Sequence, residues 1–387
     1  MSVRVWPPRP LVLMWLIDQR YIRSFDWISF FVVLILATLG LLFVFSATYR
    51  PDLPYSLFFK KQLFGIITGL IIYFIFCAVD YRTLERTGYF LYFLVIALLI
   101  FTIIKGSIGM GAQRWINIGI TKFQPSELTK LFLPSFISYY LFTEEKELSA
   151  LTFSDFLPLF FILGTSFFLI RKQPDLGTAL IVLLSGIILL WLAGLRRKFF
   201  IAALIGCSVT APVLWSCLRP YQQNRIKVFL GAGDTKKERY QIEQSRIAIG
   251  SGGLAGKGFL KGTQNKFMFL PEGRTDFIFA VICEEWGFLG ALIVIFLYSV
   301  LFIRLFYVIG TIQNFFAQLL ATGLVIHIVF STIVNMSMVM GLMPIVGIPL
   351  PFISYGVSNL WICFASLGWF NSIAMRRFYM SFSGTKF

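Results

Sequence analysis

Carboxylates stand beside long apolar runs in this sequence, where such a group can act as a base. Asp276 is the clearest case, because only apolar residues follow it until Glu284. A carboxylate next to low-dielectric surroundings can have a raised pKa and accept a proton. The same position also suits a helix N-cap, a common role of Asp at a helix start. The sequence spacing alone favours the role of Asp276 as a helix N-cap, and its role as a general base is the alternative hypothesis.

Two further motifs bring charges to the same side of the predicted membrane. Glu127 and Lys130 lie three apart in FQPSELTK, so a helix places them on one face. Such an intramembrane pair is either a functional site or a buried ion pair that fixes the helix. Asp175, in QPDLGTA, fits the positive end of a helix dipole. Because Asp175, Asp276, Glu127 and Arg114 converge on one side, a site is more plausible than any single residue suggests.

Six glycines and two lysines lie in the run IAIGSGGLAGKGFLKGTQ, residues 247–264. Glycines let the backbone approach a phosphate, and Lys257 and Lys261 add positive charge. The run matches no nucleotide-binding motif, so alone it indicates anion binding only weakly. Glu284 and Glu285 lie further on, inside an apolar run, and are expected to pair with a basic side chain rather than to do catalysis.

The segment GLMPIVGIPLPFISYG, residues 341–356, is rich in proline and glycine. Irregular backbone at membrane depth is tolerated where it is buried in protein or lines a cavity. We therefore expect a re-entrant loop that walls the site, with Ser354 and Tyr355 offering hydrogen bonds. His327 is the only histidine, which argues against a histidine metal site or a Ser–His–Asp triad.

Composition sets the class of protein that must position these groups. Of the 387 residues 58% are hydrophobic and 13% charged, and the mean hydropathy is +0.80. An all-α polytopic membrane protein follows, with one bundle spanning residues 1–387. Apolar runs predict about ten transmembrane helices, near 28–48, 63–79, 88–104, 125–142, 154–170, 176–194, 199–217, 277–306, 313–340 and 354–375.

Basic residues predict the orientation of the bundle. The predicted cytoplasmic segments hold 14 Lys and Arg and the short outer loops 8, so both termini are expected in the cytoplasm. Residues 1–27 and 376–387 are then cytoplasmic, and 218–276 form a large extracytoplasmic loop between helices 7 and 8. That loop holds 11 basic and 5 acidic residues. The net charge of +16 suits anionic headgroups or phosphate rather than nucleic acid.

Taken in order, these motifs resemble those of the SEDS family (shape, elongation, division and sporulation). The similar runs are GAQRWINIG, FQPSELTK, QPDLGTA, NRIKVFL with YQIEQSRIAIGSGGLAGKGFLKGTQ, FLPEGRTDFIFAVICEEWGFLG, and GLMPIVGIPLPFISYG. The resemblance covers about residues 25–378 and is closer to the RodA branch than to the FtsW branch. Two positions differ from the family pattern: Arg274 stands where His is usual, and Val357 replaces a glycine.

The resemblance implies a peptidoglycan glycosyltransferase of the cytoplasmic (inner) membrane that polymerises lipid II on its outer face for cell elongation and shape. It also implies partners: a monofunctional penicillin-binding transpeptidase and other elongation-complex membrane proteins. The family's essential aspartate falls on Asp276. Its other charged motif residues, expected to bind substrate, fall on Glu127, Lys130 and Asp175.

In the expected reaction, Asp276 is the general base for a sugar 4-hydroxyl, which displaces undecaprenyl pyrophosphate with inversion. Arg114, Arg225, Lys257 and Lys261, or a divalent cation, would stabilise the leaving group, with Lys130 lying deeper. The alternative function is a lipid II flippase or transporter. Polar motifs on one side and the lack of an inverted repeat argue against that class. A membrane scaffold would leave the charged motifs unexplained.

Overall fold

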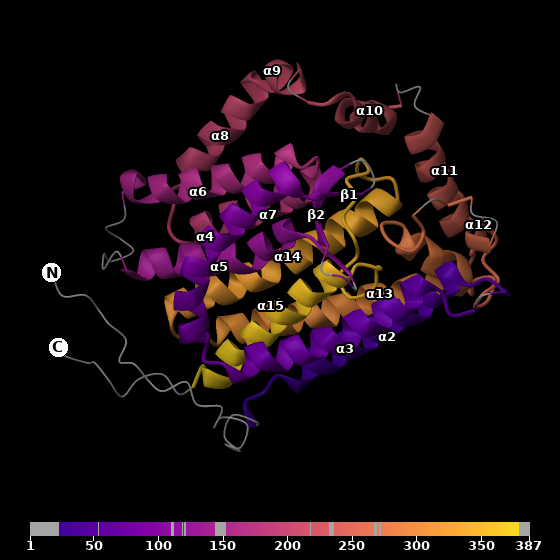
Figure 1. Cartoon of the computed structure of the whole chain (residues 1–387), viewed down its shortest axis with the longest axis horizontal. Coiled ribbons are helices and arrows are strands. Elements are labelled where there is room, and N and C mark those ends of the chain that lie inside the picture. The colour runs from indigo at the N-terminus through magenta and orange to yellow at the C-terminus, as the bar shows by residue number, and fades with distance from the viewer. Residues whose placement is uncertain are drawn as a thin grey trace.

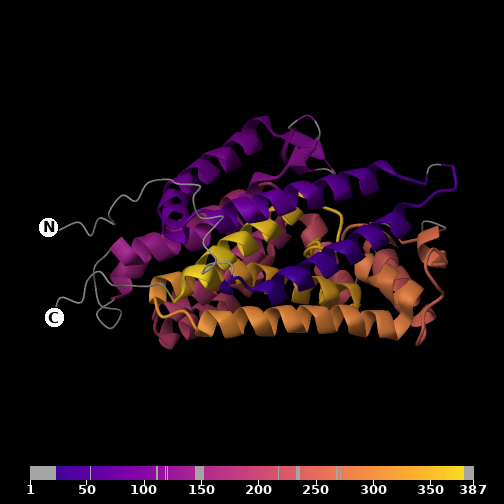
Figure 2. The same cartoon turned by 90° about the horizontal axis from the view of Figure 1, so that it is seen from below.

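The computed structural model describes residues 23–378, apart from 53, 110–111, 118, 120, 144–151, 217, 232–235, 267–268 and 271. Most of this range is helical. The longer helices are α2 (Trp27–Thr48), α3 (Leu57–Ala78), α4 (Tyr81–Lys105), α5 (Pro125–Thr143), α6 (Phe153–Lys172), α7 (Leu176–Leu192), α13 (Ile278–Gly310), α14 (Phe315–Val339) and α15 (Val357–Arg376). They form one bundle (Figure 1, Figure 2). The predicted segments before residue 23 and after residue 378 lie outside the described residues.

The helices follow the predicted apolar runs closely. Six of them, α2, α3, α4, α6, α13 and α14, are long and apolar enough to cross a membrane, which makes the chain a multi-pass membrane protein. The apolar α7 is shorter, at 17 residues. The run predicted at 199–217 differs from expectation, because it divides into α8 (Arg197–Val209) and α9 (Ala211–Ser216). Pro212, which has no N–H to continue a helical ladder, lies just after that break.

The centre of the bundle is formed by α14 and α15. Nearly every residue of α15 is buried, including the large side chain of Trp369. Glycines allow α3 and α15 to approach closely: Gly69 faces Phe364, and Gly368 faces the backbone of Tyr73. Small residues at such contacts are typical of helix packing within membranes. This rigid centre ends in the loop 341–356, which reaches the candidate site.

A short antiparallel sheet corrects the expectation of an all-α fold. Its strands are β1 (Ser107–Gly109), β2 (Ala112–Asn117) and β3 (Lys122–Phe123), in the order β1-β2-β3. Strands β2 and β3 are antiparallel, with Ile116 opposite Phe123 and Asn117 opposite Lys122. These strands are too short to show a period in the sequence. The sheet bridges α4 and α5 and holds Arg114 on β2.

A helical segment leaves the bundle and returns to it near α13. Figure 1 shows α8, α9 and α10 (Pro220–Phe229) arching away from α6 and α7, and α11 (Lys236–Ser251) descending towards α12 (Thr263–Lys266). Through this arch the chain brings Arg225, on α10, and the glycine-rich run after α11 to the end of the bundle where α13 begins.

Candidate active site

Asp276 lies in the turn of residues 272–276, directly before α13, which we call the Asp276 turn. The amide of Asn335, on α14, donates hydrogen bonds to Asp276 O at 2.9 Å and to Ile348 O at 2.7 Å. Ser354 Oγ donates to Thr275 O at 2.6 Å. The turn is thereby attached to the loop 341–356, as expected for a loop that walls the site.

The Asp276 carboxyl is half-buried, and its surroundings disfavour its charge. Burial is the largest cause that raises the pKa of Asp276, to about 6. The Glu272 carboxylate adds to this rise in pKa, whereas Arg225 and Arg114 oppose it. A Cβ at Gly347 would lie 3.4 Å from Asp276 Oδ2, so glycine leaves space against the carboxylate. Phe277, not Asp276, takes the N-cap position of α13 and makes no side-chain cap. The role of Asp276 as a base stays a prediction.

Asp175 caps α7 and also faces the site. Its Oδ1 accepts a hydrogen bond from Thr178 N at 3.2 Å, which confirms the expected capping role. Its Oδ2 accepts one from Gln124 Nε2 at 2.5 Å. Arg114 Nη1 lies 3.6 Å from Asp175 Oδ1, and its Nε is buried without a hydrogen-bond partner. Arg114 therefore retains donor capacity towards Asp276 or a ligand.

Arg225 reaches the same site from the arch. Its Nη1 donates to Val346 O at 3.3 Å, so α10 is bonded to the loop 341–356. The electrostatic effect of Arg225 on Asp276 exceeds that of Arg114. The structure thus brings four predicted residues together around one point: Asp276, Asp175, Arg114 and Arg225.

Glu127 and Lys130 form the predicted pair on one face of α5. Lys130 Nζ lies 2.9 Å from both carboxylate oxygens of Glu127, and both side chains are almost fully buried. Asn359 Nδ2, on α15, donates to Glu127 Oε2 at 2.9 Å. The pair therefore links α5 to α15, and it is Asp175, not Glu127, that ranks among the main charges acting on Asp276.

The glycine-rich loop, residues 252–264, packs against α13 by backbone contact. Lys257 N donates to Glu284 O at 3.0 Å and Gly258 N to Glu285 O at 2.9 Å, so these amides are occupied. Gly256 has a φ of 79°, and a Cβ there would collide with Glu285 O. Gly287, with φ 66°, interrupts α13 at this contact. The glycines thus account for close packing rather than for an exposed row of anion-binding N–H groups.

Lys257 and Lys261 differ in their surroundings. Lys257 Nζ lies 2.7 Å from Glu284 Oε1, which confirms that Glu284 pairs with a basic side chain. Thr263 N and Gln264 N donate to the same oxygen. The adjacent Glu285 accepts a hydrogen bond from Ser46 Oγ instead of an ion pair. Lys261 is exposed. A role of either lysine towards substrate stays a prediction.

Several residues of the site were not found from sequence: Asn335, Gln124, Asn359 and Glu272. Asn335 had a detectable signal, because a lone amide within an apolar span must find partners in the bundle. His327 is a core residue, as expected, since its Nε2 lies 3.0 Å from Ser366 Oγ. Within the described parts of the chain, no three His, Cys, Asp or Glu side chains gather to hold a metal ion. A divalent cation at the leaving group stays a prediction.

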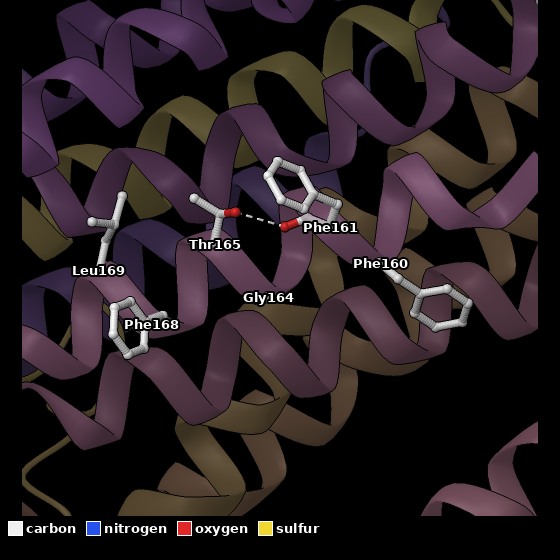
Figure 3. Close-up of a pocket in the computed structure, with 6 residues that line it drawn as sticks. All are labelled: Phe160, Phe161, Gly164, Thr165, Phe168 and Leu169. Carbon is white, nitrogen blue, oxygen red and sulfur yellow. Dashed lines mark hydrogen bonds between the residues drawn. The ribbon is translucent and has the colours of Figure 1, made fainter.

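A shallow hollow on α6 lies apart from these charges (Figure 3). Its lining is apolar except for Thr165, whose hydroxyl donates to Phe161 O at 2.8 Å. Phe161 and Phe168 are exposed there. The hollow offers no group that could act on a substrate, and its surface suits contact with lipid chains.

Comparisons with known proteins agree with this architecture. The peptidoglycan glycosyltransferase MrdB of Escherichia coli K12 is 38% identical over 320 residues, 82% of this chain and 86% of the relative. The stage V sporulation protein E of Bacillus subtilis is 34% identical, over 89% of this chain and 95% of the relative. In both, the similarity extends through most of the molecule.

Solved structures show the same fold. A chain of a peptidoglycan synthase complex has a TM-score of 0.77 at 27% identity, covering 92% of this chain and 99% of that chain. The rod shape determining protein RodA of Thermus thermophilus has a TM-score of 0.69 at 27% identity, covering 92% and 98%. The family model described as cell cycle protein, for FtsW, RodA and SpoVE, matches residues 26–379. The chain belongs to this FtsW/RodA/SpoVE family, the SEDS family.

Proposed function

We propose that this protein is a peptidoglycan glycosyltransferase that polymerises lipid II into β-1,4 glycan strands for cell elongation and shape. The observation that carries the proposal is Asp276, a half-buried carboxylate with a pKa raised to about 6, beside Arg225 and Arg114. A base is most effective when its pKa lies near the working pH. Membership of a family whose relatives are named peptidoglycan glycosyltransferases supports the same activity.

In this mechanism Asp276 removes the proton of the acceptor's 4-hydroxyl as that oxygen attacks C1 of the donor sugar. The new O4–C1 bond forms while the bond from C1 to the pyrophosphate oxygen breaks. Undecaprenyl pyrophosphate leaves with the electron pair, so an α-linked donor gives a β-linked product. Arg114 and Arg225 stabilise the charge that develops on the leaving group.

The other predicted residues have secondary roles in this proposal. Asp175 fixes Arg114, because the two side chains lie 3.6 Å apart. Glu127 and Lys130 hold α5 against α15 through Asn359. In this proposal the pair also borders the substrate. Lys261, which is exposed on the glycine-rich loop, approaches the pyrophosphate, whereas Lys257 is engaged by Glu284.

The proposal includes a topology for the whole chain. Ten spans place both termini in the cytoplasm, and residues 218–276 outside, so the site faces the outer leaflet, where lipid II is consumed. A monofunctional penicillin-binding transpeptidase is the proposed partner. The resemblance to a chain of a peptidoglycan synthase complex, described as coordinating polymerization and crosslinking, supports this pairing.

The test uses the purified protein with its transpeptidase partner and lipid II in detergent. Wild type is expected to make glycan polymer and Asp276→Ala none. Asp80→Asn is the matched control, because Asp80 caps α4 away from the site. Polymer from Asp276→Ala at the wild-type rate would overturn the role of Asp276. Lipid II translocation in vesicles without any polymer from wild type would favour the flippase.

A further inference from the structure

Arg274 lies two residues before Asp276 but belongs to different surroundings. Its guanidinium Cζ lies 4.1 Å from the centroid of the Phe58 ring, on α3. Tyr355 packs edge-on against that ring, with centroids 5.3 Å apart. We call Arg274, Phe58 and Tyr355 the Arg274 platform. The chief cations acting on Asp276, Arg225 and Arg114, come instead from α10 and β2.

The platform and these cations belong to different elements: Phe58 is on α3, whereas Arg225 is on α10 and Arg114 on β2. In Figure 1, α3 runs along the side of the bundle opposite α6, α7 and the arch of α8 to α10. The Asp276 turn is bonded to α14 and to the loop 341–356, and the same loop bonds both Arg225 and Arg274. One carboxylate is therefore flanked by two separate groups of positive charge.

The Arg274 guanidinium has donors left over. Its Nε is buried without a hydrogen-bond partner, and within the described residues no carboxylate lies at ion-pair distance from it. A buried donor that is left unpaired is unfavourable unless something else bonds to it. Lys61 lies three residues after Phe58 on α3, half-buried, and adds positive charge on that face.

The platform is also held rigidly. Tyr355 N donates to Arg274 O at 2.9 Å. Gln62, one turn after Phe58, donates from Nε2 to Ser354 O at 3.3 Å, which attaches α3 to the same loop. An arginine stacked on an aromatic ring presents its N–H edge in a fixed direction, suited to bidentate binding of a carboxylate or phosphate. Stacking alone would explain the ring contact but not the unpaired buried Nε.

We propose that the Arg274 platform is a second anion subsite, which binds an anionic group of the acceptor substrate. This inference rests on the proposed polymerisation, in which Asp276 deprotonates the acceptor while Arg114 and Arg225 face the donor's pyrophosphate. The bound group is a pyrophosphate or a carboxylate of the acceptor's peptide, because both present paired oxygens to a guanidinium. Two subsites would hold the two substrates by separate groups of positive charge around the same base.

The test measures initial polymerisation rates of the protein with its transpeptidase partner, as a function of lipid II concentration. Arg274→Gln is expected to raise KM about tenfold, the usual effect of losing a charge-assisted hydrogen bond. Arg274→Lys keeps the positive charge but lacks the paired N–H donors of a guanidinium, so its KM should lie between those of wild type and Arg274→Gln. Arg239→Gln, an exposed arginine on α11, is the matched control and should behave as wild type.

A second substrate separates the two sources of the anion. Lipid II whose peptide carboxylates are amidated keeps its pyrophosphate. If Arg274→Gln raises KM only for the ordinary substrate, the subsite binds the peptide carboxylate. If KM rises for both substrates, the subsite binds pyrophosphate. An unchanged KM for both substrates, whatever happens to kcat, overturns the subsite.

Controls for folding and for the parent proposal complete the design. If Arg274→Gln does not fold, Phe58→Leu is measured in its place, because it removes the stacking ring and leaves the charge of Arg274. Phe58→Leu should also raise KM. An unchanged KM would overturn the subsite. Failure of wild type to polymerise would refute the proposed function itself. Normal polymerisation by wild type with no effect at Arg274 or Phe58 would refute the second subsite alone.

Discussion

The Asp276 turn and the glycine-rich loop come from the same predicted loop, yet they do different work. In the glycine-rich loop, Lys257 is paired with Glu284, and the amides of residues 257 and 258 are bonded to α13. In the Asp276 turn the backbone is bonded through Asn335 and Ser354, and Thr275 Oγ1 donates to Glu272 Oε2 at 3.1 Å. The side chains around Asp276 keep unpaired donors, such as Arg114 Nε.

The difference shows how to tell a structural cluster of charges from a reactive one. Lys257 and Glu284 pair with each other, and the glycine-rich loop is bonded to α13 through its backbone, so these groups contribute to the folded state. One oxygen of Glu284 and one of Glu285 are nevertheless buried without a hydrogen-bond partner. The turn at 272–276 fixes its backbone, and no hydrogen bond joins the Asp276 carboxylate to the other described residues, which is the arrangement that a preorganised base requires. Substitutions in the loop should therefore alter stability, and substitutions in the turn should alter rate.

Asp276→Asn tests the reactive region and should have the largest effect. The amide cannot accept the proton, so the polymerisation rate should fall by about 10²- to 10⁴-fold. Thermal unfolding should stay near that of wild type, since burial already disfavours the charge that the substitution removes. Rate and melting temperature measured on the same preparation check this. If the polymerisation rate falls only in proportion to the amount of folded protein, Asp276 would be a structural residue like those of the glycine-rich loop.

Lys257→Met tests the structural region. It leaves Glu284, 1% exposed, as a buried carboxylate without its cation, which should destabilise the protein by about 3–5 kcal/mol. The double variant Lys257→Met, Glu284→Met should recover most of this loss. The KM of the protein that remains folded should not change. A raised KM at normal stability would instead make Lys257 a substrate ligand.

Asn335→Ala tests how firmly the Asp276 turn must be held. It removes both bonds from the amide, to Asp276 O and to Ile348 O. A base misplaced in this way should lower kcat about tenfold with little change in KM. Thr332→Val is the matched control, because its buried hydroxyl bonds only within α14, to Ile328 O. Equal losses in the two variants would show a general packing defect.

Sequence predicted the helical elements well because their signal is local. Apolar runs give the positions of α2 through α7 and α13 through α15 within a few residues, except that α3 and α4 begin six and seven residues before the predicted runs. The break between α8 and α9 and the strands at 107–123 were not predicted. Both are too short to produce a periodic pattern, and the strands form through pairing with one another.

The site was predicted in part, and its failures have a physical cause. Asp276, Asp175, Arg114 and Arg225 were named, but spacing could not show that they meet, since they come from four separate segments. The close packing of the glycine-rich run on α13 was not predicted, because glycine permits close approach to a helix as readily as to a phosphate. Asn335 was missed because its partners are backbone carbonyls, and the sequence does not show which carbonyls lie near it.

The pH dependence of polymerisation should sharpen the contrast further, with the smallest effects. Asp276 acts as a base only when ionised, so kcat/KM should rise with pH through about 6 and then level off. Glu272 raises the pKa of Asp276, so Glu272→Gln should move this rise to lower pH. Arg225 lowers that pKa, so Arg225→Gln should move the rise in kcat/KM to higher pH. It should also reduce the plateau, because a donor to the leaving group is lost.

Lys257→Met should leave the midpoint of the pH profile unchanged, since Lys257 lies about two helical turns away, roughly 12 Å along α13. Rate profiles of the three variants test the order, and a shift of the same sign for Glu272→Gln and Arg225→Gln would contradict the role of Asp276 as the titrating base.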